Sequence, residues 1–272
     1  MRQRPGAGGG CRAPVGSEMR ILLTNDDGIH APGLVALGQA LAPLGDVVTL
    51  APERPRSAMG HAVTLHKPLR IWPVKLPHGG RAFATNGTPA DCVALGTSEY
   101  VGQRPSLVVS GINLGPNLGV DMFYSGTVAA AMEAAISGLP AFAISIASYE
   151  SADFEPAAQF ARYLAEVVEA RSLPKGTFLN VNVPPLSAAE MAGVAVTRQG
   201  RITYSNRIER RTDPRGMAYY WLTGDRVDED DGADSDAAAV REGKISVTPV
   251  RIDLTDEDLL RTLATWSLRW PV

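Results

Sequence analysis

The chain has 272 residues, of which 45% are hydrophobic and 20% are charged, as in an ordinary soluble protein. Its formal net charge is −3 and no basic face stands out, so we do not expect a stable nucleic-acid partner. No apolar stretch approaches the roughly 18 residues that a membrane helix needs, so no membrane partner is expected. The two cysteines, Cys11 and Cys92, provide no disulfide framework and favour a reducing, cytoplasmic location.

Composition and periodicity divide the chain into three parts. Residues 1–18 are rich in Gly, Pro and Arg and lack the apolar region of a secretory signal, so we expect a flexible tail. Residues 19–190 alternate between strand-like and helix-like patterns and form the expected core. Residues 191–272 have a more antiparallel, loop-rich pattern, which predicts a β-rich arm followed by a final helix.

The core begins with a βαβ unit made of strand 20–24, helix 31–43 and strand 47–51. Farther on, the segment Thr88-Pro89-Ala90-Asp91 has the pattern of a capped helix start. Other expected strands lie at 62–65, 69–72, 107–109, 141–146 and 178–183, and other expected helices at 127–137 and around 160–167. Strands that alternate with helices predict an α/β fold with a mostly parallel sheet and right-handed crossovers.

The C-terminal part has a different pattern. Segments 194–197, 218–222 and 245–250 are expected strands, and residues 255–258 cap a short final helix. The acidic run 225–236 resembles a calcium-binding loop but has other residue types at several ligand positions. We therefore expect a solvated loop there.

The most informative motif is Thr24-Asn25-Asp26-Asp27-Gly28-Ile29, between the first expected strand and the first expected helix. Ligands bind at this edge of open α/β sheets. Consecutive strand side chains point to opposite faces, so Asp26 and Asp27 can converge only if the chain turns there, which Gly28 permits. Two carboxylates held that close need a cation or another partner. We expect a hard metal ion, used for phosphate chemistry.

Two further segments follow strands that end at the same edge. Ser57 follows strand 47–51, and a simple turn serine is the alternative interpretation. Asn113 and Asn117 lie in the Gly- and Asn-rich segment 110–119, where a long loop after a central strand is usually functional. Asn113 offers a neutral oxygen. A donor set of Asp, Asp, Ser and Asn suits Mg²⁺, Mn²⁺ or Ca²⁺ better than zinc.

The triplet Ser125-Gly126-Thr127 opens an Ala-rich helix. Its backbone N–H groups, its hydroxyls and the positive end of the helix dipole favour a phosphate or a carboxylate. Plain N-capping is the alternative, because Ser or Thr begins many helices. The chain has neither the P-loop pattern nor a G-x-G-x-x-G motif after its first strand, so neither of those phosphate sites is expected.

Five motifs, in order, resemble the SurE family, the survival protein E nucleotidases. They are residues 24–29, the Pro-x-Arg-Ser stretch ending at Ser57, and residues 87–93, 110–113 and 124–128. Residues 180–184 and 246–249 extend the resemblance, so that it spans residues 19–255.

The resemblance implies a Rossmann-like core with helices on both faces and a C-terminal arm exchanged between subunits in homodimers or homotetramers. It also implies a divalent-metal-dependent 5′-nucleotidase that acts on nucleoside 5′- and 3′-monophosphates, and sometimes on short polyphosphate, with one Mg²⁺ or Mn²⁺ per subunit. The implied metal ligands are Asp26, Asp27, Ser57 and Asn113. The implied phosphate and substrate contacts are Asn25, Asn117, Ser125, Gly126 and Thr127.

Two chemical routes stay open at this point. Either Asp26 or Asp27 orients or deprotonates an attacking water, or an Asp attacks phosphorus and forms an aspartyl phosphate. The adjacent Asp-Asp pair lacks the one-residue gap expected of the second route, which favours the first. A non-catalytic sensor of metal–nucleotide complexes is the rival interpretation from another class, and the preferred nucleotide is not fixed by any motif.

Overall fold

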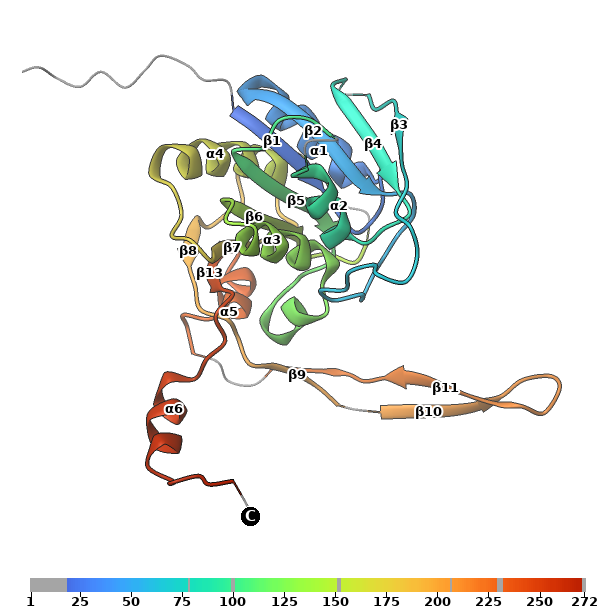
Figure 1. Ribbon diagram of the computed structural model, residues 1–272, viewed down its shortest axis with the longest axis vertical. Coiled ribbons are helices and arrows are strands. Elements are labelled where there is room, and N and C mark those ends of the chain that lie inside the picture. The colour runs from blue at the N-terminus through green and yellow to red at the C-terminus, as the bar shows by residue number, and fades with distance from the viewer. Residues whose placement is uncertain are drawn as a thin grey trace, which may run out of the picture.

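The computed structural model describes residues 19–77, 79–98, 101–150, 153–205, 207–228 and 232–270. The expected tail, residues 1–18 with Cys11, lies outside these ranges. The described chain is an α/β fold in which one large twisted sheet forms the centre and a long hairpin projects from one end (Figure 1). Among the described helices, none has the length and apolar character needed to cross a membrane.

In the described part of the chain, the main sheet has nine strands in the order β3-β4-β2-β1-β5-β6-β7-β13-β8. Neighbours from β4 to β7 pair in parallel, β3 and β13 run antiparallel to β4 and β7, and β8 is parallel to β13. The parallel strands are β1 (Met19–Thr24), β2 (Gly45–Pro52), β4 (Arg81–Thr85), β5 (Leu107–Leu114), β6 (Ala141–Ile146) and β7 (Thr177–Val183). The outer strands are β3 (Ile71–Val74), β13 (Ile245–Arg251) and β8 (Val194–Val196).

Helices cover both faces of this sheet. Helices α1 (Pro32–Leu41) and α4 (Glu155–Arg171) pack on one face, and α2 (Pro89–Gly96) and α3 (Gly126–Ile136) pack on the other. The alternation of strand side chains explains the two cores, because Ile21 and Leu23 of β1 join the α1–α4 cluster whereas Leu22 joins the α2–α3 cluster. Two short 3₁₀ segments, η1 (Ala42–Leu44) and η2 (Gly119–Phe123), follow α1 and precede α3.

The predicted start of α2 is confirmed in detail. The Thr88 hydroxyl accepts a hydrogen bond from the Asp91 backbone N–H at 3.1 Å, and the Asp91 carboxylate accepts one from the Thr88 N–H at 2.9 Å. Pro89 occupies the first turn, where its missing N–H costs nothing. This reciprocal cap fixes the point at which the chain enters the helix.

The chain after residue 190 contributes to both the core and the arm. Strands β8 and β13 join the main sheet, whereas β10 (Arg207–Thr212) and β11 (Ala218–Thr223) form an antiparallel hairpin that extends well away from the sheet (Figure 1). Strands β9 (Ile202–Tyr204) and β12 (Arg226–Asp228) pair at the base of this hairpin. Helix α5 (Asp236–Arg241) lies beside β13, and α6 (Glu257–Ala264) follows it as an exposed final helix.

Two strand predictions differ from the structure, and one core strand lies outside the predicted set. Segment 62–65 is not a strand, because the Thr64 N–H donates to the Asp91 carboxylate of the α2 cap at 2.9 Å instead of joining the sheet. Strand β4 was not expected, since Arg81–Thr85 is short and follows two glycines. Strand β5 continues to Leu114, so the first half of the expected loop 110–119 lies in the sheet.

Candidate metal and phosphate site

A tight turn after β1 sets the position of the two aspartates. Gly28 has a φ of +100°, a backbone conformation that favours glycine. The Asn25 side chain closes the turn, because its Oδ1 accepts from the Gly28 N–H at 3.2 Å and its Nδ2 donates to the Gly28 carbonyl at 3.1 Å. Asn25 is fully buried, so the structure places this expected substrate contact inside the turn and not on the pocket wall.

The expected metal ligands come together in one polar pocket of about 350 Å³. Asp26 and Asp27 follow β1, Ser57 follows β2, and Asn113 lies near the end of β5, so the ends of three parallel strands supply them. Of the expected phosphate contacts, Asn117 and Ser125 also line this pocket. A backbone bond from the Arg56 N–H to the Asp26 carbonyl, at 2.7 Å, holds the Ser57 segment beside the aspartates.

Asp26 is the most buried acidic group of the pocket, with a relative exposure of 5%. Burial raises the pKa of its carboxyl to about 6, and the neighbouring charge of Asp27 adds to this shift. The Thr127 hydroxyl donates to Asp26 Oδ1 and opposes the shift. The chain therefore compensates an ionised Asp26 only in part, and a bound cation would supply the remainder.

Asp27 and Asn113 are held by the backbone of the same loop. Burial raises the pKa of Asp27, and the Leu114 N–H, 3.4 Å from its Oδ2, opposes this shift. The amide nitrogen of Asn113 donates to the Gly115 carbonyl at 2.7 Å. This bond orients the Asn113 side chain and leaves its amide oxygen as the acceptor group.

The donor chemistry fits a hard divalent cation. Within the described ranges, no three His, Cys, Asp or Glu side chains form a metal-binding group. A cation between Asp26 and Asp27 would therefore complete its coordination with neutral oxygens, and the hydroxyl of Ser57 and the amide oxygen of Asn113 line the same pocket. An all-oxygen set of two carboxylates and two neutral groups suits Mg²⁺ or Mn²⁺.

The start of α3 lies directly behind Asp26. A Cβ atom built on Gly126 would lie 2.8 Å from Asp26 Cβ, so only glycine allows the helix to come this close. Ser125 is the N-cap and accepts from the Val128 N–H at 3.1 Å, as the capping interpretation predicts. Gly126 and Thr127 thus support Asp26 from behind and are not among the residues that line the pocket, whereas Ser125 is.

The Asn117 segment is anchored by two neighbouring strands. Asn117 Nδ2 donates to Ser145 Oγ of β6 at 2.7 Å, and its backbone N–H donates to Asn182 Oδ1 of β7 at 2.8 Å. Asn180 Nδ2 of β7 donates to the Asn117 carbonyl at 2.8 Å. Sequence reasoning gave these three anchors no role, although two asparagines spaced by two in a buried strand are a detectable signal.

Comparison with known proteins identifies the family. Residues 21–206 match the family model described as Survival protein SurE. The chain belongs to the SurE family. It is 50% identical over 260 residues to the 5′-nucleotidase SurE of Moorella thermoacetica, an alignment that covers 93% of this chain and 98% of that protein.

Other relatives agree with this assignment. The 5′-nucleotidase SurE of Geobacter sulfurreducens is 49% identical over 251 residues, with 92% of this chain and 94% of that protein covered. The crystal structure of the SurE protein from Aquifex aeolicus superposes with a TM-score of 0.79 at 40% identity and covers 90% of this chain and 98% of that chain. The expected family and the expected α/β fold are both confirmed.

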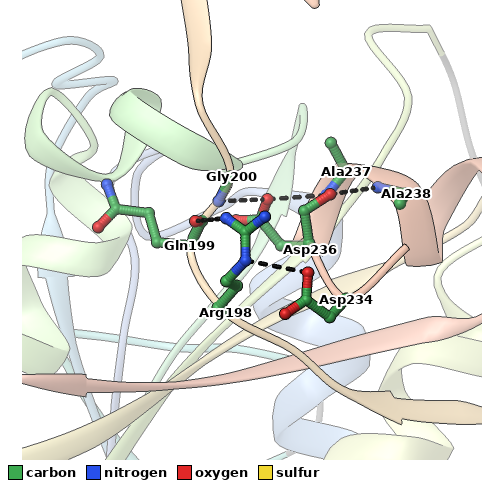
Figure 2. A network of polar contacts seen from close by, with 8 residues as sticks. Arg198, Gln199, Gly200, Asp234, Asp236, Ala237 and Ala238 are labelled. Atoms are coloured by element: carbon green, nitrogen blue, oxygen red, sulfur yellow. Dashed lines mark hydrogen bonds and ion pairs between the residues drawn. The ribbon is translucent and has the colours of Figure 1, made fainter. Parts of the chain in front are cut away.

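In this member of the SurE family, a second layer of contacts ties the pocket loop to the base of the arm. Asp236 is fully buried, and its Oδ2 accepts from the Gly119 N–H at 2.9 Å, two residues beyond Asn117. Its Oδ1 accepts from the N–H groups of Gly200 at 3.0 Å and Ala237 at 2.7 Å (Figure 2).

This arrangement corrects the expectation of a solvated loop over 225–236. Residues 229–231 lie outside the described residues, but the end of the run packs against the core. Asp234, at the surface, pairs with Arg198 at 2.9 Å (Figure 2). Ser235 caps α5. Asp236 is buried because its carboxylate accepts hydrogen bonds from three backbone N–H groups. Local sequence could not reveal this, since its partners lie up to 117 residues away.

Proposed function

We propose that this chain is a divalent-metal-dependent 5′-nucleotidase that hydrolyses nucleoside 5′-monophosphates to nucleoside and phosphate. The observation that carries the proposal is the convergence of Asp26, Asp27, Ser57 and Asn113 on one polar pocket. The printed names of the relatives, 5′-nucleotidase SurE, support it. The family pattern also extends the proposal to 3′-monophosphates and short polyphosphate.

Asp26, Asp27, Ser57 and Asn113 would hold one Mg²⁺ or Mn²⁺ per subunit. When bound, the cation would neutralise charge on the phosphoryl oxygens and lower the pKa of a water molecule. Asp26 lines the pocket beside this position and would orient or deprotonate that water molecule. Asn117 and Ser125 would hold the substrate phosphate on the pocket wall.

Thr127 and the α3 start would position this base. The Thr127 hydroxyl donates to one Asp26 oxygen and leaves the other for proton transfer or metal binding. Removing the Thr127 hydroxyl would free the Asp26 carboxylate to rotate, and catalysis is sensitive to such displacements.

The decisive experiment measures phosphate release from AMP with Mn²⁺ or Mg²⁺, with and without a chelator. We expect metal-dependent turnover, and we expect Asp26→Asn and Asp27→Asn each to lower it by about 100-fold or more, because each removes a charge from the metal and base site. Asp46→Asn is the matched control, since Asp46 lies at the surface and pairs with Arg81 at 2.7 Å. Its turnover should equal that of the unchanged chain.

Three results would contradict the proposal. Normal turnover of Asp26→Asn at saturating Mn²⁺ would refute the role of Asp26. Trapping of an aspartyl phosphate would show that an Asp, and not a water molecule, attacks phosphorus. Metal-dependent AMP binding without phosphate release from several monophosphates would identify the chain as a sensor.

The proposal includes a cytoplasmic homo-oligomer. Cys92 is a free, buried thiol, which fits a reducing compartment. Large apolar side chains are exposed on the hairpin and beyond α6, including Leu222 and Trp270, each 86% exposed. Such surfaces on an extended arm suit contacts between subunits, so we propose a homodimer or homotetramer.

A further inference from the structure

Three tyrosines stand around the pocket that holds the two aspartates, and neither the metal nor the phosphate role uses them. Tyr124, Tyr149 and Tyr204 all line the pocket, yet they are 63%, 73% and 38% exposed. They come from three separate segments: the end of η2, the loop after β6, and β9 at the base of the hairpin. We call these residues the tyrosine rim.

The rings of Tyr204 and Tyr149 and the backbone of Tyr124 contact the framework of the site. The Tyr204 hydroxyl donates to Asp121 Oδ2 at 2.9 Å. The Tyr149 ring packs on Gly115, where an added Cβ would lie 3.2 Å from its Cε1 atom. Tyr124 precedes the N-cap of α3, and its carbonyl accepts from the Gly60 N–H at 2.9 Å.

Anchored rings that remain this exposed point to a flat, apolar ligand group. A tyrosine ring is a large apolar surface that is usually packed against other groups. Exposed rings gathered at the mouth of a polar pocket therefore indicate a surface that a ligand covers. The pocket volume of about 350 Å³ lies within the range of small-molecule sites and exceeds what a phosphate and one cation would fill. Nucleotides are phosphomonoesters that carry such a flat aromatic group.

We propose that the tyrosine rim is the nucleobase subsite. The phosphate lies deep in the pocket against Asn117 and Ser125, and the base stacks on the exposed ring faces at its mouth. The inference rests on the proposed nucleotidase function and adds a preference among nucleobases to it. Because stacking uses the π-face that every base has, the subsite accepts all bases and prefers purines, which offer the larger face.

The test compares AMP with ribose 5-phosphate, which has the same phosphate and sugar but no base. Tyr149→Ala should raise the KM for AMP by about 5-fold to 150-fold, the range that loss of one base–aromatic stack produces. Its KM for ribose 5-phosphate should stay unchanged. Tyr149→Phe keeps the ring and should behave like the unchanged chain, and Tyr204→Ala should follow Tyr149→Ala.

Tyr163→Ala is the matched control, because Tyr163 is a 59% exposed tyrosine on α4 that lies outside the pocket lining. Equal increases in KM for both substrates would show that the rim only supports the loop, and no change for AMP would show that it does not contact the base. Either result overturns the inference and leaves the nucleotidase function standing.

A chain that releases no phosphate from either substrate would refute the proposed function separately. The rim is then tested by calorimetric titration of AMP and of ribose 5-phosphate in the presence of Mn²⁺. A selective loss of AMP affinity in Tyr149→Ala supports the subsite, and equal affinities in the variant and the unchanged chain refute it.

Discussion

At the scale of single residues, Asp26 is the point where several separate constraints meet. The Gly28 turn aims it, the Arg56 N–H holds its carbonyl, and the Thr127 hydroxyl holds its carboxylate. Gly126 allows the α3 start to lie against it. These contacts fix the geometry of a buried charge without neutralising it, so the metal-free chain carries an electrostatic cost at this position.

This cost predicts a pH dependence of stability in the metal-free chain. The pKa of Asp26 is raised from 3.8 to about 6 on folding, so the folded chain binds the proton more tightly than the unfolded chain does. The contribution of this group to stability therefore increases as the pH falls through about 6, and it is lost again at higher pH. The full difference is about 3 kcal/mol, because each tenfold change in proton affinity corresponds to about 1.4 kcal/mol.

Urea denaturation in the presence of a chelator measures this effect when the unchanged chain is compared with Asp26→Asn. The variant should be the more stable of the two at neutral pH, and its advantage should shrink as the pH falls below the pKa of Asp26. Titrating groups that do not interact with Asp26 cancel in the comparison. A stability difference between the two chains that is constant across this pH range would show that burial does not raise the pKa of Asp26.

At the scale of elements, the loop 115–123 depends on contacts that come from late in the chain. Its Asn117 end is held by β6 and β7, and its Gly119 end is held by Asp236 at the start of α5. The loop is thus supported by β6, β7 and α5, all of which follow it in the chain. The precision of the proposed phosphate contacts depends on this support.

Asp236→Asn tests this support. The substitution turns one acceptor oxygen into a donor that faces a backbone N–H, and an unsatisfied buried group costs about 1–3 kcal/mol. We expect a loss of stability of that size in urea denaturation, together with a higher KM for AMP. Asp234→Asn, two residues away, is the control: Asp234 is 71% exposed in its pair with Arg198, so the change should cost less than about 1 kcal/mol. Equal effects of the two substitutions would remove the case for a supporting role.

Much of the site could be predicted because its signals are local. The turn at Gly28, the caps at Thr88 and Ser125 and the buried strands before Asp26 and Asn113 each follow from a few neighbouring residues. Parallel strand ends then place these segments at one edge of the sheet. What could not be predicted depends on distant partners.

Asp236 illustrates that limit, since an acidic residue in an acidic run looks solvated until its partners from distant segments are known. Likewise, nothing in Asn25 alone distinguishes a turn-closing side chain from a substrate contact. Strand β4 was not predicted, because its five-residue pattern is too short to distinguish from a loop.

At the scale of the whole molecule, the hairpin exposes an apolar surface that suits the proposed self-association. Ile208 and Leu222 are directly opposite each other in the β10–β11 ladder, and they are 65% and 86% exposed. Tyr220, on the same face, is 61% exposed. An apolar strip of this kind, displayed far from the core, has little to bury it within its own chain.

Leu222→Asp should therefore lower the molar mass measured by light scattering, because a charge would have to be buried in the proposed interface. Tyr163→Asp changes an exposed aromatic residue on the core and should leave the mass unaltered. A monomeric mass for the unchanged chain, or an unaltered mass for Leu222→Asp, would place the interface elsewhere or exclude it.

The two ends of the main sheet are poor templates for further strands. The outermost strand on one side, β3, has four residues and includes Pro73, which has no N–H to donate. The strand at the other end, β8, has only three residues. Open edges of long strands promote amyloid-like stacking, and short or proline-containing ones suppress it. The chain can thus expose an apolar hairpin at high concentration while the edges of its main sheet resist the addition of strands from other molecules.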